Sequence, residues 1–182
     1  GHRPWALLLI VRRLSSNMKS IQESKLMSEI TELADKLKTE GEKFIGFFSE
    51  LNESQWQQEV YTEGEMWTIR NVLSHFVTSE RGLVKLFEQI RQGGAGAADD
   101  FSIDRYNASQ QAKTKDLSPV ELLEQYKEVR ANSVAWVSGL KDEELEIKGR
   151  HPFLGETVLR EMVKMLYIHN QLHYRDLKKS LK

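Results

Sequence analysis

The sequence contains no cysteine, and this absence removes several kinds of site at once. Without thiols the chain cannot form disulfides, bind zinc through thiolates or use a cysteine nucleophile. Any metal ion would therefore be held by histidine, aspartate or glutamate side chains. The lack of cysteine also suits a bacterial protein of the cytoplasm, which is the location we expect.

The sequence also lacks an excess of charge of one sign. Lysine and arginine together number 26, aspartate and glutamate 27, and the formal net charge is −1. No long run of one sign interrupts this balance, so the chain lacks the basic patch that usually grips DNA or RNA. We expect no nucleic-acid partner.

A long apolar run is missing from the N-terminal region. The apolar residues 4–11 lie between positive charges and fall far short of the ~20 residues that cross a bilayer. We therefore expect no membrane span there. With 182 residues, 40 % of them hydrophobic, the chain is long enough for one domain with a core and too short to make two comfortably.

The first 17 residues are expected to lie outside this domain. Gly1-His2 resembles the remnant of a cleaved tag, and Met18 would make a natural start for the rest. Residues 3–13 are interpreted as sequence upstream of the domain or, alternatively, as an arm that docks or anchors the protein. The predicted domain is 18–182.

Apolar residues that recur every three or four positions predict four long helices. The expected ranges are 20–51, 68–91, 118–139 and 155–179. A capping box of Ser20 and Glu23 begins the first, and Ser118 with Pro119 begins the third. A short polar helix ending near Lys115 precedes the third. Since no stretch alternates convincingly over strand length, the predicted fold is all-α, a four-helix bundle with a short extra helix between helices 2 and 3.

Three histidines on these helices form the strongest candidate site. His169 and His173 are four residues apart, so they stand one helical turn apart and can reach a single ion. His75, on the second helix, is the candidate third ligand. A weak repeat of the helix pair, in which 51–56 resembles 140–145, would let His75 face the other two across the bundle.

Three neutral imidazoles would leave one to three positions on a zinc or nickel ion open for water and substrate. Open positions are typical of a catalytic site, whereas a structural site would have a fourth protein ligand. The alternative is that each histidine is an ordinary half-buried residue with a backbone partner. An inward-facing pair with a third histidine on a facing helix favours the metal site.

Other polar residues are weaker candidates. His151 could line the mouth of the site or act as an acid or base, although a histidine in a loop more often faces solvent. Glu80 lies on the apolar side of its helix and needs a partner, which could be a ligand histidine, Arg130 or Arg105. No general acid or base can be assigned with these residues.

Three further residues lie near the histidines in the sequence or begin one of their helices. Tyr174 and Asp176 follow His173 closely in sequence but point elsewhere on the helix, so we expect them on a solvated face. Trp67 begins the helix of His75 and could form one wall of a pocket.

The order and spacing of these motifs resemble the DinB-like (DinB/YfiT) superfamily over about residues 30–177. Trp67-Thr68 with His75 eight residues after the Trp, and later His169-x-x-x-His173, carry most of the resemblance. Further matching pieces are Asp104-Arg105-Tyr106-Asn107, Ser118-Pro119 with Leu122-Leu123, Arg130, Asp142-Glu143-Glu144-Leu145, Gly149-Arg150-His151-Pro152 and Leu154-Gly155. The resemblance implies a four-helix bundle in which three histidines bind a divalent ion, commonly zinc or nickel. It also implies transfer of thiol cofactors, or isomerisation with their help.

Two interpretations of function follow. In the first, the protein is a metal-dependent enzyme, an S-transferase that uses a thiol cofactor or a hydrolase, acting on a small molecule such as a low-molecular-weight thiol. In the second, it is a binding or interaction module whose site is vestigial, for example a homodimer formed through the outer faces of its helices. The presence of all three candidate ligands favours the first.

Overall fold

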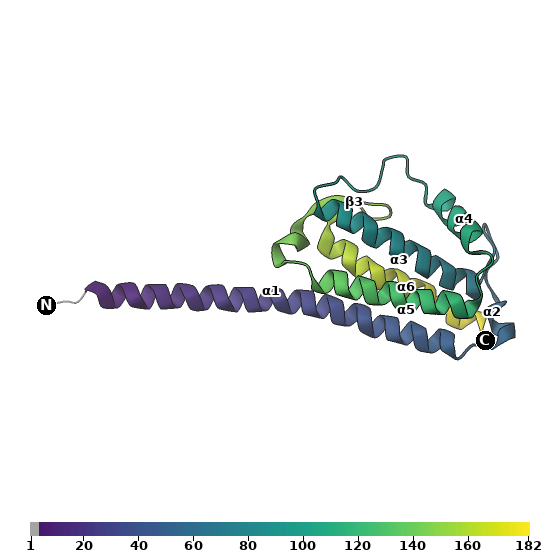
Figure 1. The fold of residues 1–182 in the computed structure, drawn as a ribbon, viewed down its shortest axis with the longest axis horizontal. Coiled ribbons are helices and arrows are strands. Elements are labelled where there is room, and N and C mark those ends of the chain that lie inside the picture. Colours follow the sequence, from purple (N-terminus) through teal and green to yellow (C-terminus); the bar gives the residue numbers. More distant parts are fainter. Residues whose placement is uncertain (1–3) are drawn as a thin grey trace.

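The computed structural model describes residues 4–182, and within the first helix the side chains of 15–19, 21 and 29–49. Four long helices, shown in Figure 1, make up the bundle: α1 (Pro4–Ser49), α3 (Ile69–Arg91), α5 (Pro119–Ser138) and α6 (Leu159–Ser180). The short helix α4 (Ile103–Thr114) precedes α5. The predicted four-helix bundle, with its extra helix between the second and third long helices, is confirmed.

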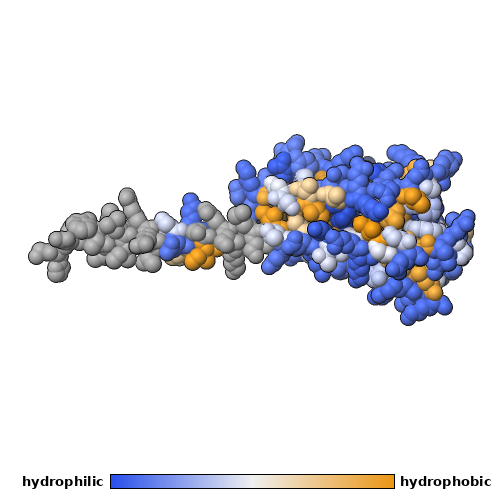
Figure 2. Space-filling view, turned by 60° about the horizontal axis from the view of Figure 1, so that its bottom comes forward, coloured by the Kyte–Doolittle hydropathy of each residue, from blue (hydrophilic) through white to orange (hydrophobic). Residues whose placement is uncertain are grey.

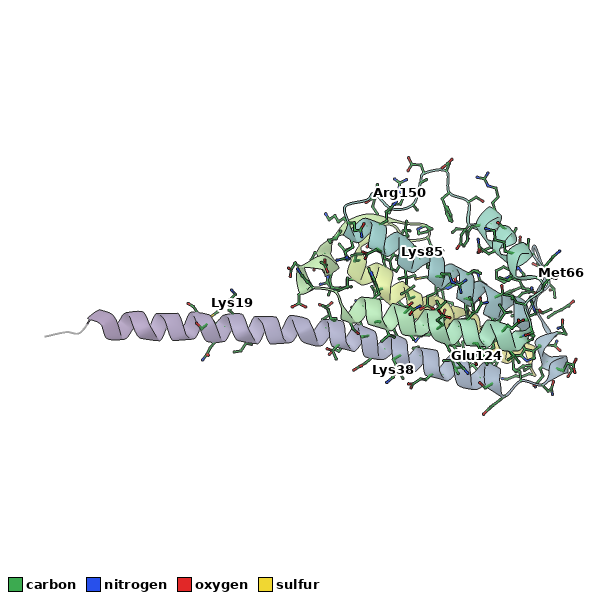
Figure 3. All side chains as sticks on the ribbon, in the orientation of Figure 1. Lys19, Lys38, Met66, Lys85, Glu124 and Arg150 are labelled. Carbon is green, nitrogen blue, oxygen red and sulfur yellow. The ribbon has the colours of Figure 1, made fainter. Side chains whose placement is uncertain are left out.

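The start of the first helix was predicted incorrectly. Helix α1 begins at Pro4 rather than at about Ser20, so the Ser20–Glu23 pattern lies inside it. No glycine or proline occurs from Trp5 to Glu40, and nothing in that stretch therefore interrupts the helix. The N-terminal part of α1, which carries Lys19, projects beyond the bundle (Figures 1 and 3).

Two of the three connections between long helices, α1 to α3 and α5 to α6, each contain a short helix and a two-stranded hairpin. Between α1 and α3 lie α2 (Glu53–Trp56), β1 (Glu59–Tyr61) and β2 (Trp67–Thr68); between α5 and α6 lie η1 (Asp142–Glu146), β3 (Lys148–His151) and β4 (Gly155–Val158). Both hairpins are antiparallel. After each hairpin, the first residue of the next helix donates its backbone N–H to a carbonyl just before the hairpin: Ile69 donates to the Gln58 carbonyl, and Leu159 donates to the Ile147 carbonyl. The expected repeat of the helix pair is therefore visible in the order of the elements.

The core is divided into two apolar clusters along the bundle. One contains Leu37, Phe87 and Leu145, and the other contains Phe44 and Phe76 with further residues of α1, α3, α5 and α6. The aromatic rings of Phe44 and Phe76 meet edge to face, 5.5 Å between centroids. Burial of these side chains is the main stabilising contribution, and it fixes α3 and α6 beside each other.

The connection between α3 and α4 is hydrogen-bonded to the β3–β4 hairpin. Gly96 pairs with Arg150, and Ala97 donates its backbone N–H to the Arg150 carbonyl at 2.8 Å. Gly96 has a φ of +95°, and a Cβ there would overlap the Arg150 backbone, so only glycine fits. Arg150 lies beside this connection in Figure 3 and forms an ion pair with Asp99. These backbone contacts place residues that follow Gly96, such as Ala97 and Phe101, beside α3.

Hydrophilic residues cover most of the bundle face seen in Figure 2, with apolar patches between them. Across residues 4–182, no helix is both long enough and apolar enough to cross a membrane.

Candidate metal centre

The three predicted histidines lie together on facing helices. His75 is on α3, which begins at Thr68, whose side chain accepts the Asn71 backbone N–H in a capping box. His169 and His173 are one turn apart on α6. The Nε2 atoms of His75 and His169 are 3.0 Å apart, as are those of His169 and His173. One ring nitrogen from each histidine lies within 4.8 Å of the other two, so the structure brings the whole triad to one point.

This spacing fits a metal ion. Ligand nitrogens of a tetrahedral zinc, each ~2.0–2.1 Å from the ion, are about 3.3 Å from one another. The two 3.0 Å separations are close to that value. Imidazole is also a ligand that suits both zinc and nickel. The residues present therefore fit a divalent ion.

Burial keeps the three rings neutral. Desolvation lowers the pKa of His75 well below its ordinary value, and the nearby His169 and His173 lower it further. Desolvation and His173 lower the pKa of His169 to about 3. Desolvation also lowers the pKa of His173, although the charge of Asp176 opposes the shift. Neutral imidazoles keep a free lone pair, which is the state that metal binding requires.

Tyr61 and Asp176 orient His173. The Tyr61 hydroxyl, on β1, donates to the Asp176 carboxylate at 2.8 Å and lies 2.7 Å from His173 Nδ1. Burial and the Asp176 carboxylate raise the pKa of Tyr61, so the hydroxyl keeps its hydrogen. Since that single hydrogen is donated to Asp176, the hydroxyl oxygen accepts from His173 Nδ1–H. The lone pair of His173 is therefore left on Nε2, the atom that faces His169.

Sequence reasoning missed this pair. Asp176 was expected on a solvated face, but it lies three residues after His173 and binds Tyr61. Tyr174 was also expected there, yet its ring packs edge to face against Phe44, 5.1 Å between centroids. Tyr61 gave no signal, because it lies in the irregular link before α3. Asn107 on α4 was also missed as a neighbour of the His75 ring, whose pKa it raises against the larger effect of desolvation.

Glu80 is not part of the site. Its carboxylate accepts two hydrogen bonds from Arg130, at 2.8 and 3.0 Å, and both side chains are 4 % exposed. Arg130 also donates to the Leu37 carbonyl at 2.9 Å. Of the partners considered for Glu80, the structure selects Arg130. The cluster is a structural ion pair in the core.

A cavity of about 450 Å³ opens onto the triad, and all three histidines line it. Trp67 forms one wall, as its position at the start of the helix suggested, with its ring centroid 4.9 Å from that of His75. His151 lines the cavity as well. The expectation that His151 faces solvent is wrong, because the ring is 3 % exposed beneath the β3–β4 turn.

Comparisons with known proteins agree with the fold. The family model of the DinB superfamily matches residues 36–177. YfiT from Bacillus subtilis, described as a probable metal-dependent hydrolase with an unusual four-helix bundle topology, superposes with a TM-score of 0.60 at 19 % identity, covering 87 % of this chain and 85 % of YfiT. An uncharacterised protein from Clostridium difficile 630 gives 0.58 at 18 % identity, covering 86 % and 94 %.

The colibactin self-resistance protein ClbS, whose structure is of a complex with double-stranded DNA, gives a TM-score of 0.56 at 15 % identity, covering 86 % of this chain and 95 % of ClbS. No curated protein matches the chain. These likenesses to solved structures concern the fold, while the family model covers most of the sequence. The chain therefore belongs to the DinB superfamily.

Proposed function

We propose that this protein is a divalent-metal-dependent enzyme that acts on a small molecule, with His75, His169 and His173 as the ligands of zinc or nickel. The observation that carries the proposal is the convergence of three ring nitrogens within 4.8 Å at the wall of a 450 Å³ cavity. A cavity of this size is in the range of small-molecule sites. It gives a substrate direct access to the ion.

The surrounding residues prepare the site without supplying a fourth ligand. Tyr61 and Asp176 hold His173 with its Nε2 lone pair toward the triad. Trp67 and Phe76 pack beside the rings of His75 and His169. When bound, the ion would supply Lewis-acid chemistry, polarising a carbonyl or holding a water or thiol in its anionic form.

Hydrolysis is the reaction type that we favour. The structurally similar YfiT is described as a probable metal-dependent hydrolase, and the open side of the triad suits attack by water. Transfer of a thiol cofactor, which the sequence resemblance also implied, is the second candidate. The complex of ClbS with DNA concerns that protein; for this chain, the balanced charge continues to predict no nucleic-acid partner. A cytoplasmic location and a homodimer stay predictions.

The decisive experiment measures metal content. The protein is purified without a nickel column, and metals are quantified by mass spectrometry. About one zinc or nickel per chain is expected, and His169→Ala should abolish it. Gln171→Ala, on an exposed neighbour in the same helix, is the control and should keep the metal. Absence of stoichiometric metal in the wild type, or an unchanged content in His169→Ala, would overturn the proposal.

A further inference from the structure

The cavity beside the triad is built from uncharged residues. Its walls come from β2, α3, α4, α6, the connection before α4 and the β3–β4 turn, and no aspartate, glutamate, lysine or arginine of the described chain lines it. Leu83, Leu86 and Met165 contribute much of the inner surface. A charged ligand would lose its hydration on entering and find no opposite charge in the walls.

The mouth of the cavity is apolar too. Four of the lining side chains are large, hydrophobic and exposed: Phe101 (42 %), Ile103 (40 %), Phe153 (67 %) and Leu172 (50 %). Single exposed apolar residues are common on protein surfaces. These four come from three segments of the chain and line the same cavity, which is the arrangement expected where an apolar molecule binds.

Two polar groups in the lining already use their hydrogens within the protein. The Ser79 hydroxyl donates to the His75 carbonyl at 2.6 Å. The Tyr106 hydroxyl donates to the Thr78 carbonyl at 3.0 Å. Neither hydroxyl hydrogen is free for a ligand.

His151 differs from these two groups. Its Nδ1 accepts the backbone N–H groups of Phe153 and Leu154, both at 3.1 Å. An atom that accepts two N–H groups carries no hydrogen, so the hydrogen of the neutral ring is on Nε2. Burial lowers the pKa of His151 to about 4, which keeps the ring neutral near pH 7. Nε2 is buried, and no hydrogen-bond partner for it is found in the described part of the chain.

A buried donor without a partner is unfavourable, so a bound molecule or water that accepts its hydrogen would be stabilising. Three buried side-chain atoms in the described residues have no partner, on Glu40, Asp142 and His151. Among these three residues only His151 lines the cavity. An acceptor atom on a bound molecule would satisfy it.

We propose that the cavity binds an uncharged, largely apolar molecule that carries one hydrogen-bond acceptor, such as an ester or amide carbonyl, for His151 Nε2–H. This inference rests on the proposed function for the identity of the site, and it narrows the substrate class. It disfavours thiol cofactors that carry carboxylates. The molecule fills the apolar walls, His151 fixes its orientation, and the triad lies at the same cavity.

The test uses metal-free protein, so that its result does not depend on metal binding. A panel of aryl methyl esters, each paired with its own carboxylate, is titrated and followed by NMR shifts of cavity residues; reduced glutathione and propylbenzene complete the panel. We expect the esters to bind at least 10-fold more tightly than their carboxylates. Tighter binding of the carboxylates or of glutathione, or no binding of any ester at the cavity, would overturn the inference.

Two variants separate the contributions. His151→Phe removes the donor and should weaken ester binding about 3- to 10-fold, as expected for one hydrogen bond, while leaving propylbenzene unchanged. An equal loss for both ligands would argue against the role of His151. Because His151 also holds the β3–β4 turn, Ile103→Lys provides a test away from it and should shift the preference toward carboxylates. Val120→Lys, at an exposed site on α5 outside the cavity, is its control.

Discussion

Helix α3 carries two buried polar clusters that differ in how their atoms are satisfied. Glu80 and Arg130 meet in a bidentate ion pair, and the arginine has a further acceptor in the Leu37 carbonyl. In the histidine triad, His75 lies five residues before Glu80 on α3 and meets His169 and His173 of α6, and the three neutral rings face a cavity. A cluster whose groups satisfy one another stabilises the fold, whereas one with lone pairs directed at a common point is available to bind an ion.

Breaking the ion pair should have the largest effect on stability. Arg130→Met leaves the Glu80 carboxylate buried without its partner, which is expected to lower the free energy of unfolding by about 3–5 kcal/mol. Urea unfolding followed by circular dichroism measures this change. Arg81→Met, at an exposed position next to Glu80 on α3, should change it by less than about 0.5 kcal/mol. A loss below about 1 kcal/mol for Arg130→Met would mean that this cluster does not support the core.

Removing a ring from the triad should lower zinc affinity strongly while changing the folded structure little. His75→Ala is expected to lower zinc affinity by more than about 100-fold, because changes to groups that only orient a ligand already cost 10–100-fold. Helix content should fall little, since the rings face a cavity. Competition titration with a zinc chelator and far-ultraviolet circular dichroism give the two readouts. Unchanged zinc affinity in His75→Ala would remove the distinction between the two clusters.

The orienting pair should have an intermediate effect. Tyr61→Phe keeps the ring but removes the acceptor of His173 Nδ1–H, and zinc affinity should fall about 10–100-fold. Tyr174→Phe is the matched control, because the Tyr174 ring packs against Phe44 and Phe47 and lies outside the Tyr61 hydrogen bonds. If both variants bound zinc like the wild type, Tyr61 would be a packing residue only.

The helices and the His169–His173 pair could be predicted because their signals are local, whereas His75, 94 residues before His169, was assigned from the repeat of the helix pair and the family resemblance. Apolar periodicity defines each helix, and the four-residue spacing of His169 and His173 places both rings on one side of α6. The contacts of Tyr61 could not be predicted, since it meets His173 across 112 residues and Asp176 across 115, from a link without periodicity. The burial of His151 was hidden for a similar reason: it depends on how the hairpin folds over α3. The start of α1 was misplaced because a capping pattern at Ser20 also occurs within a continuous helix.

The smallest predicted effect concerns pH and separates the neutral imidazoles from the ion pair. Because burial lowers the pKa of His151 from about 6.5 to about 4, the unfolded chain binds a proton there that the folded protein does not. This contribution to stability is complete above pH 6.5 and is lost as the pH falls toward 4. Between pH 7.5 and 6 it amounts to about 0.8 kcal/mol. Urea unfolding of zinc-free protein at pH 7.5 and at pH 6 measures this contribution. Between the two pH values, the free energy of unfolding of the wild type should fall by about 0.8 kcal/mol more than that of His151→Phe. Desolvation, which both proteins share, is the largest cause of the lowered pKa of each triad histidine, so most of their contribution cancels in the comparison, while the smaller effect of His151 on the pKa of His169 is present in the wild type alone. Equal changes would mean that His151 is not held neutral by burial.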